Sequence, residues 1–139
     1  MAVRMAILAD TSGILALLDR DEQYHQATVK IVERETIWVP ATILPEVDYL
    51  ATKHLGERVA RAFLEALVEN YFTYIPVEQS DLVRSHQIMT RYRDATIGLV
   101  DSSIVALAER YQTRCILTLD RRHFNLIKPQ GIDYLELLP

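Results

Sequence analysis

Short apolar runs recur along the chain and predict the strands of a sheet. The first run, residues 4–9 ("RMAILA"), is continuous rather than alternating, which is typical of a parallel strand covered on both faces. Further runs follow at intervals that leave room for helices between them. They are residues 36–40 ("TIWVP"), 71–77 ("YFTYIPV"), 114–119 ("RCILTL") and, as a last short strand, 131–138 ("GIDYLELL").

The segments between these runs place apolar residues at helical spacing. In the segment "ERVARAFLEALVEN", for example, the apolar residues Val59, Phe63, Leu64 and Leu67 fall on one face of a helix. The same reasoning applies to the other intervening segments. The expected helices are residues 13–19, 21–35, 43–55, 57–70, 79–93 and about 100–111.

Capping residues support several of these helix boundaries. Thr11 or Ser12 offers an N-cap for the first helix, and Thr42 offers one for the helix over residues 43–55. Gly56 stands where that helix should end. Because strands and helices alternate along the chain, the pattern predicts an α/β fold with a parallel sheet.

Composition places the chain among ordinary globular proteins. Its 139 residues fit a single domain over residues 1–139, and 50% of them are hydrophobic. The net charge of -4 argues against a protein that holds nucleic acid by bulk charge alone. No apolar stretch approaches the roughly 18 residues of a membrane span, and no signal peptide is visible. The only cysteine, Cys115, lies in an apolar run, so we expect a cytoplasmic protein without disulfides.

Four acidic residues fall where the chemistry of an α/β protein is usually found. Asp10 and Asp120 each end a predicted strand, and the two carboxylates would face each other if those strands are neighbours. Asp101 and Glu46 lie on the apolar faces of their helices, in the first turn. Any one of these acids has an ordinary explanation, since first-turn acids stabilise the helix dipole and aspartates open turns.

Together, the four carboxylates predict a divalent metal site. Crowded carboxylates repel one another unless cations neutralise them. Oxygen ligands without a companion cysteine or histidine pattern favour Mg²⁺ or Mn²⁺ over zinc. Such ions can activate water and stabilise the charge that develops on a phosphodiester, which makes nucleic acid the natural substrate class.

Other polar residues receive weaker assignments. Asp94 precedes the Asp101 helix and is either a distal cap or a fifth acid at the rim of the site. Ser12 and Thr118 are candidates to orient carboxylates, although a simple helix cap is the more common role for Ser12. Arg121, Arg122 and His123 follow Asp120 directly, and they either contact an RNA backbone or form a solvated turn. The histidines lack metal-ligand spacing and are interpreted as surface or helix-face residues: His25, His54, His86 and His123.

Four sequence segments together resemble the PIN-domain ribonucleases, and among them the toxins of VapBC-type toxin–antitoxin modules. They are "ILADTSGILALLD", "ATILPEVDYL", "GLVDSSIVALAER" and "ILTLDRRHF". The resemblance covers nearly the whole chain and assigns metal-binding roles to Asp10, Glu46, Asp101 and Asp120, with Asp94 matching an additional acid of many members. It implies a three-layer α/β/α sandwich with a central, mainly parallel sheet of four to five strands. It also implies Mg²⁺ or Mn²⁺ dependence, endonucleolytic RNA cleavage, frequent homodimers, and inhibition by a cognate antitoxin.

The leading hypothesis is therefore a metal-dependent endoribonuclease that acts as the toxin of a toxin–antitoxin pair. A first alternative is a non-catalytic module whose acidic groove accepts basic side chains of a partner protein. A second is a PIN nuclease with a role in RNA processing other than as a toxin. A third, a phosphatase or receiver-like domain that uses Asp10 as nucleophile, is weaker because arginines follow Asp120 where such sites usually carry a lysine.

Overall fold

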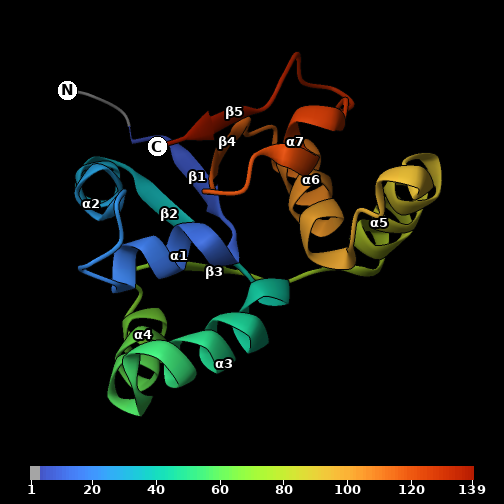
Figure 1. Cartoon of the computed structure of the whole chain (residues 1–139). Coiled ribbons are helices and arrows are strands. Elements are labelled where there is room, and N and C mark those ends of the chain that lie inside the picture. Colours follow the sequence, from blue (N-terminus) through green and yellow to red (C-terminus); the bar gives the residue numbers. More distant parts are fainter. Residues whose placement is uncertain (1–3) are drawn as a thin grey trace.

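A parallel sheet forms the centre of the structure, a computed structural model that describes residues 4–139 (Figure 1). Within these residues the sheet has five strands in the order β3-β2-β1-β4-β5, and every neighbouring pair is parallel. The predicted α/β class and parallel sheet are confirmed. The strands are β1 (Ala6–Ala9), β2 (Thr36–Pro40), β3 (Thr73–Ile75), β4 (Cys115–Leu117) and β5 (Glu136–Leu138).

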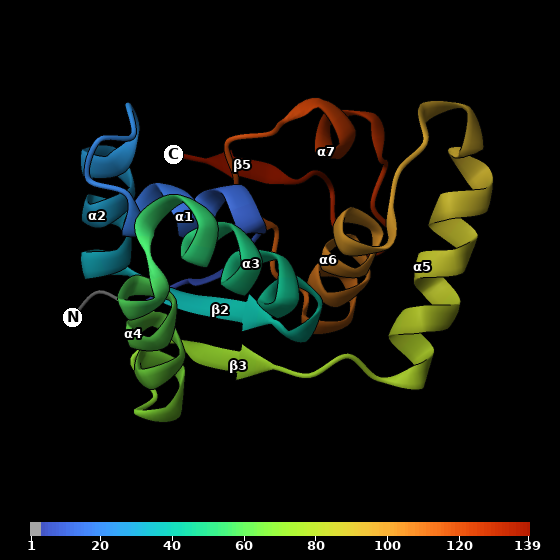
Figure 2. The same cartoon turned by 60° about the horizontal axis from the view of Figure 1, so that its bottom comes forward.

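Helices cover both faces of this sheet and complete the predicted three-layer sandwich. Helices α1 to α4 gather on one side, and α5 and α6 pack together on the other (Figures 1 and 2). No helix within residues 4–139 is long and apolar enough to cross a bilayer. The helices are α1 (Thr11–Leu18), α2 (His25–Arg34), α3 (Leu44–Leu55), α4 (Glu57–Val68), α5 (Gln79–Arg91), α6 (Leu99–Tyr111) and α7 (Arg122–Leu126), with 3-10 turns η1 (Ala41–Ile43) and η2 (Arg93–Ala95).

The strand order creates a crevice at the carboxyl ends of β1 and β4. From β1 the chain moves outward through β2 to β3, and it then returns to place β4 on the other side of β1. Ligands of open α/β sheets bind where the strand order reverses in this way. The backbone N–H of Asp10 donates to the carbonyl of Leu117 at 3.1 Å, which ties the ends of the two strands together.

The predicted caps of two helices are wrong. The N-cap of α1 is Asp10, whose carboxylate accepts from Gly13 N–H, and not Thr11 or Ser12. Thr42 does not cap α3, because its hydroxyl hydrogen-bonds the Ser103 hydroxyl at 2.8 Å. The contact of Thr42 is with a distant segment, which local sequence does not reveal.

Two ion pairs fix α6 against α5. Arg84 donates to Glu109 at 2.7 Å, and Arg110 donates to the buried carboxylate of Asp81 at 2.9 Å. The hydrogen bonds that Arg110 donates to Asp81 raise the pKa of the Arg110 guanidinium above its ordinary value. Because the Asp81 side chain is only 2% exposed, this pair is shielded from solvent and holds α6 in place over the sheet.

Gly13 allows the first turn of α1 to approach β4 closely. A Cβ at this position would lie 2.3 Å from the Leu117 carbonyl oxygen, so any larger side chain must displace the backbone. We expect Gly13→Ala to lower the free energy of unfolding by about 1–3 kcal/mol, as overpacking does. Urea unfolding measures the loss. Gly98→Ala is the control, since nothing lies within 4 Å of an added Cβ there. Equal stability of the two variants would contradict this account of Gly13.

Candidate active site

Acidic side chains from four separate segments line one cleft at the carboxyl ends of β1 and β4. The cleft has a volume of about 390 Å³. Asp10 directly follows β1, and Asp120 lies just beyond β4. Glu46 and Asp101 stand in the first turns of α3 and α6. The structure thus brings together all four acids that the sequence selected. The other lining residues are Thr11, Ser12, Gly98, Leu99 and Val100.

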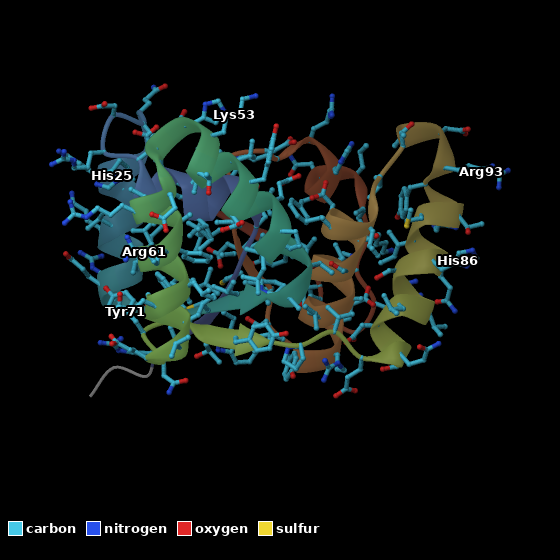
Figure 3. All side chains as sticks on the ribbon, turned by 90° about the horizontal axis from the view of Figure 1, so that it is seen from below. His25, Lys53, Arg61, Tyr71, His86 and Arg93 are labelled. Atoms are coloured by element: carbon cyan, nitrogen blue, oxygen red, sulfur yellow. The ribbon has the colours of Figure 1, made fainter. Side chains whose placement is uncertain are left out.

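No basic side chain is among the described residues that line this cleft. Figure 3 shows labelled cationic side chains, such as Lys53 and Arg93, projecting outward from the surface. Arg61, also labelled there, pairs with Glu57 of its own helix at 2.8 Å. The acids of the cleft therefore have no arginine or lysine among its lining residues to balance their charge.

Asp10 is the most deeply buried of the four acids, with 4% of its surface exposed. Its Oδ1 accepts from Ser12 Oγ and from Gly13 N–H, both at 2.8 Å, and its Oδ2 accepts from Thr118 Oγ1. Burial raises the pKa of its carboxyl from 3.8 to about 6, and the charge of Asp101 adds to the rise. The three hydrogen bonds oppose that rise and hold the carboxylate in one orientation.

Ser12 and Thr118 support this carboxylate, as the sequence suggested. Ser12 Oγ also accepts from Leu119 N–H at 2.8 Å, so this hydroxyl links α1 to the end of β4. Thr118 is fully buried, and its hydroxyl accepts from Asp120 N–H at 3.0 Å. Through Thr118, the position of Asp10 is coupled to the loop that carries Asp120.

The remaining acids are held less tightly. Glu46 and Asp120 are exposed, while Asp101 is half-buried. Asp120 Oδ1 accepts from the backbone N–H of Arg122 at 3.3 Å. Asp101 Oδ2 lies 2.7 Å from Nδ1 of His123, a contact that the sequence interpretation of His123 as a surface or helix-face residue missed.

The donor set of the cleft fits a hard divalent cation, although the acids do not form a closed cage. Within residues 4–139 no three acid, histidine or cysteine side chains lie close enough to hold a metal ion together. Thr11 lines the cleft, and its buried hydroxyl oxygen has no hydrogen-bond partner in the described structure. An all-oxygen donor set beside an unpaired hydroxyl suits Mg²⁺ or Mn²⁺ with part of its water shell.

Comparison with known proteins places this chain in a family. The sequence profile of the PIN domain matches residues 7–128, which is most of the chain. The chain belongs to the PIN-domain family. It is 33% identical over 135 residues to ribonuclease VapC26 of Mycobacterium tuberculosis, an alignment that covers 96% of this chain and 100% of that protein.

Solved structures share the PIN-domain fold of this chain. The sarcin-ricin loop cleaving toxin VapC20 of Mycobacterium tuberculosis matches with a TM-score of 0.76 and 16% identity, covering 84% of this chain and 92% of that chain. A toxin–antitoxin complex from Klebsiella pneumoniae contains a chain that matches with a TM-score of 0.65 and 22% identity, covering 87% of this chain and 92% of that chain. At these identities the likeness establishes the fold.

Three further residues with assigned roles lie outside the lining of the cleft. Asp94, which resembles an additional acid of PIN-domain proteins, sits in η2 and lines a separate depression with His86 and Arg93. The Arg121 side chain donates to the carbonyl oxygen of Pro139. Arg122 is exposed at the start of α7 and makes no ion pair within residues 4–139. The structure therefore does not group Asp94 with the four acids of the cleft.

Proposed function

We propose that this PIN-domain protein is a metal-dependent endoribonuclease that hydrolyses RNA phosphodiester bonds. The observation that carries the proposal is the single cleft lined by Asp10, Glu46, Asp101 and Asp120, with no basic residue among its lining. The 33% identity to ribonuclease VapC26 over most of the chain supports the choice of RNA as substrate. The proposed cofactor is Mg²⁺ or Mn²⁺, with the four acids as its ligands.

The acids of the cleft have different proposed roles. Asp10 is fixed by Ser12, Gly13 and Thr118, so it presents a carboxylate that need not reorganise when a cation arrives. Glu46 and Asp120 are exposed, so a ligand can reach their carboxylates from solvent. A bound cation would supply the Lewis acidity that activates water and stabilises charge on the phosphate. No protein nucleophile is needed for this chemistry.

The RNA backbone requires positive charge beside the acids. Arg122 follows Asp120 closely and is exposed without an ion-pair partner in the described structure, so it is the better placed of the two arginines to contact phosphate. Arg121 is engaged by the Pro139 carbonyl and would have to exchange that contact for a phosphate. Both remain proposed RNA contacts.

We also propose a cellular role as the toxin of a toxin–antitoxin pair. The similarity to VapC26, together with the shared fold of VapC20 and the Klebsiella pneumoniae complex, supports a cognate antitoxin as partner. A homodimer and a cytoplasmic location belong to the same proposal. Copurification of a small protein encoded beside this chain would test the partnership.

Metal binding is expected to stabilise the folded protein. At a Mn²⁺ concentration about a hundred times Kd, mass action adds about 2.7 kcal/mol of stability. For a domain of this size that raises Tm by on the order of 5–10 °C. Differential scanning fluorimetry in EDTA and in MnCl₂ measures the shift.

Two variants control this experiment. Asp101→Asn should lose most of the shift, whereas Asp48→Asn, an exposed acid of α3 outside the cleft, should keep it. Absence of any shift in the natural sequence, combined with tight binding of a basic peptide, would instead favour the acidic-groove binding module.

A further inference from the structure

His123 contacts one of the acids of the cleft, Asp101. Its Nδ1 is 2.7 Å from Asp101 Oδ2, and its side chain is only 14% exposed. This is the only hydrogen bond recorded for the Asp101 carboxylate within residues 4–139. His123 is not among the residues that line the cleft. It therefore contacts an acid of the cleft without itself lining the cleft.

The backbone that carries His123 is firmly anchored. Its neighbour Phe124 is 3% exposed and Ile127 is 4% exposed, so α7 is pinned into the core on both sides of one turn. Lys128 N–H donates to the Tyr92 hydroxyl at 3.0 Å, which ties the end of α7 to the segment after α5. Because α7 is short and well packed, His123 can hold the Asp101 carboxylate in a fixed orientation.

The chemistry of the two groups indicates which atom donates the hydrogen bond between His123 and Asp101. An ionised carboxylate only accepts hydrogen bonds, so the contact requires a proton on Nδ1 of His123. With Oδ2 engaged in this way, Oδ1 of Asp101 has no recorded hydrogen bond within residues 4–139, and Asp101 is one of the residues that line the cleft. Asp120 lies three residues before His123, so one short segment carries both an acid of the cleft and the hydrogen-bond partner of another.

We propose that His123 is a positioning residue that orients Asp101 for cation binding through its Nδ1–H donor. The inference rests on the proposed metal-dependent function and adds a residue to it. Hydrogen-bond partners of metal ligands typically contribute 10–100-fold to metal affinity, because they fix the orientation of the ligand. His123 holds that role here for a carboxylate whose helix, α6, has no side-chain cap at its N-terminus.

Three substitutions at one position test the donor directly. In Asn the side-chain nitrogen is bonded to Cγ, as Nδ1 is in histidine, so His123→Asn keeps a donor near Asp101. Gln places its nitrogen one bond further out, and Ala removes it. We expect His123→Ala and His123→Gln to weaken Mn²⁺ affinity about tenfold, and His123→Asn to stay within a factor of about three of the natural protein.

Isothermal titration of metal-free protein with MnCl₂ measures this affinity without relying on activity. Asn125→Ala, an exposed change in the same helix, is the control for general disturbance of α7. The free energies of unfolding of the three variants, measured with urea in EDTA, should not follow the order Asn, Gln, Ala, because the proposed role concerns metal binding. If all three His123 variants bind Mn²⁺ as the natural protein does, or all three lose affinity equally, the donor role is wrong.

The same titration separates the two proposals. Loss of Mn²⁺ binding in Asp101→Asn, together with unchanged binding in the His123 variants, would overturn the role of His123 and leave the metal site intact. Absence of Mn²⁺ binding in the natural protein would overturn both.

Discussion

Replacing Asp10 by Asn is expected to abolish metal-dependent RNA cleavage, with a loss of at least about a thousandfold in kcat/KM, on the scale of removing a main electrostatic contribution to catalysis. The substitution removes the charge and leaves the shape. Asn Oδ1 can still accept from Gly13 N–H, and its amide can donate to Thr118 Oγ1, so α1 should keep its cap. The loss would therefore come from the missing ligand and not from a disordered cleft.

The control for this variant is Asp48→Asn, which removes one negative charge from an exposed position on α3. It should cleave labelled RNA at the rate of the natural protein. If Asp10→Asn cleaves as fast as Asp48→Asn in the presence of Mg²⁺, the assignment of Asp10 as a metal ligand is wrong.

The second large expected effect is a pH dependence of stability that Asp10 alone produces in metal-free protein. Folding raises its carboxyl pKa from 3.8 to about 6, so the folded state binds this proton more tightly than the unfolded state. Well below pH 3.8 both states are protonated and the shift costs nothing. As pH rises through 6, the folded state must bury the charge. A difference of about two pKa units corresponds to about 3 kcal/mol of stability lost.

The difference between two proteins isolates this effect from the titration of other acids. Asp10→Asn cannot ionise, so in EDTA it should gain stability over the natural protein by about 3 kcal/mol between about pH 3 and pH 7. Urea unfolding at several pH values measures the gain, and Asp48→Asn should show no such trend. If the difference in the free energy of unfolding between Asp10→Asn and the natural protein stays constant with pH, the Asp10 carboxyl is not desolvated in the folded protein.

Much of the fold could be predicted because continuous apolar runs determine buried parallel strands. The run "TIWVP" matches β2 residue for residue, while β3 and β4 are shorter than their runs because pairing with neighbours sets where a strand ends. The four acids could be predicted for a related reason. Asp10 and Asp120 follow strands that lie side by side, and hydrophobic periodicity placed Asp101 and Glu46 toward the same end of the sheet.

Other features depend on contacts that no local pattern reveals. The capping role of Asp10 was missed. Ser12, one of the two expected caps, instead donates a hydrogen bond to the Asp10 carboxylate and accepts one from Leu119 N–H. Leu64 was expected on the apolar face of its helix, yet it is 57% exposed, and the buried residues of α4 are Ala60, Phe63 and Leu67. Helix α7 is only five residues long, so its periodicity is too short to detect.

The contact between His123 and Asp101 illustrates the limit for the site. The sequence signal that was available is the short interval from Asp120 to His123, which places the histidine near the end of β4. Recognising its partner requires knowing that α7 folds back over the N-terminus of α6. That arrangement is a property of the whole fold, and the contact between His123 and Asp101 reports it.

The most direct test of the central claim is RNA cleavage by protein stripped of metal with EDTA and then supplied with Mg²⁺ or Mn²⁺ in steps. The four-carboxylate site predicts no cleavage in EDTA and recovery that follows metal binding. Since water is the proposed nucleophile, the fragments should carry no 2′,3′-cyclic phosphate ends. Cleavage in EDTA at the rate seen with metal, or cyclic phosphate ends that show attack by the RNA's own 2′-hydroxyl, would contradict it.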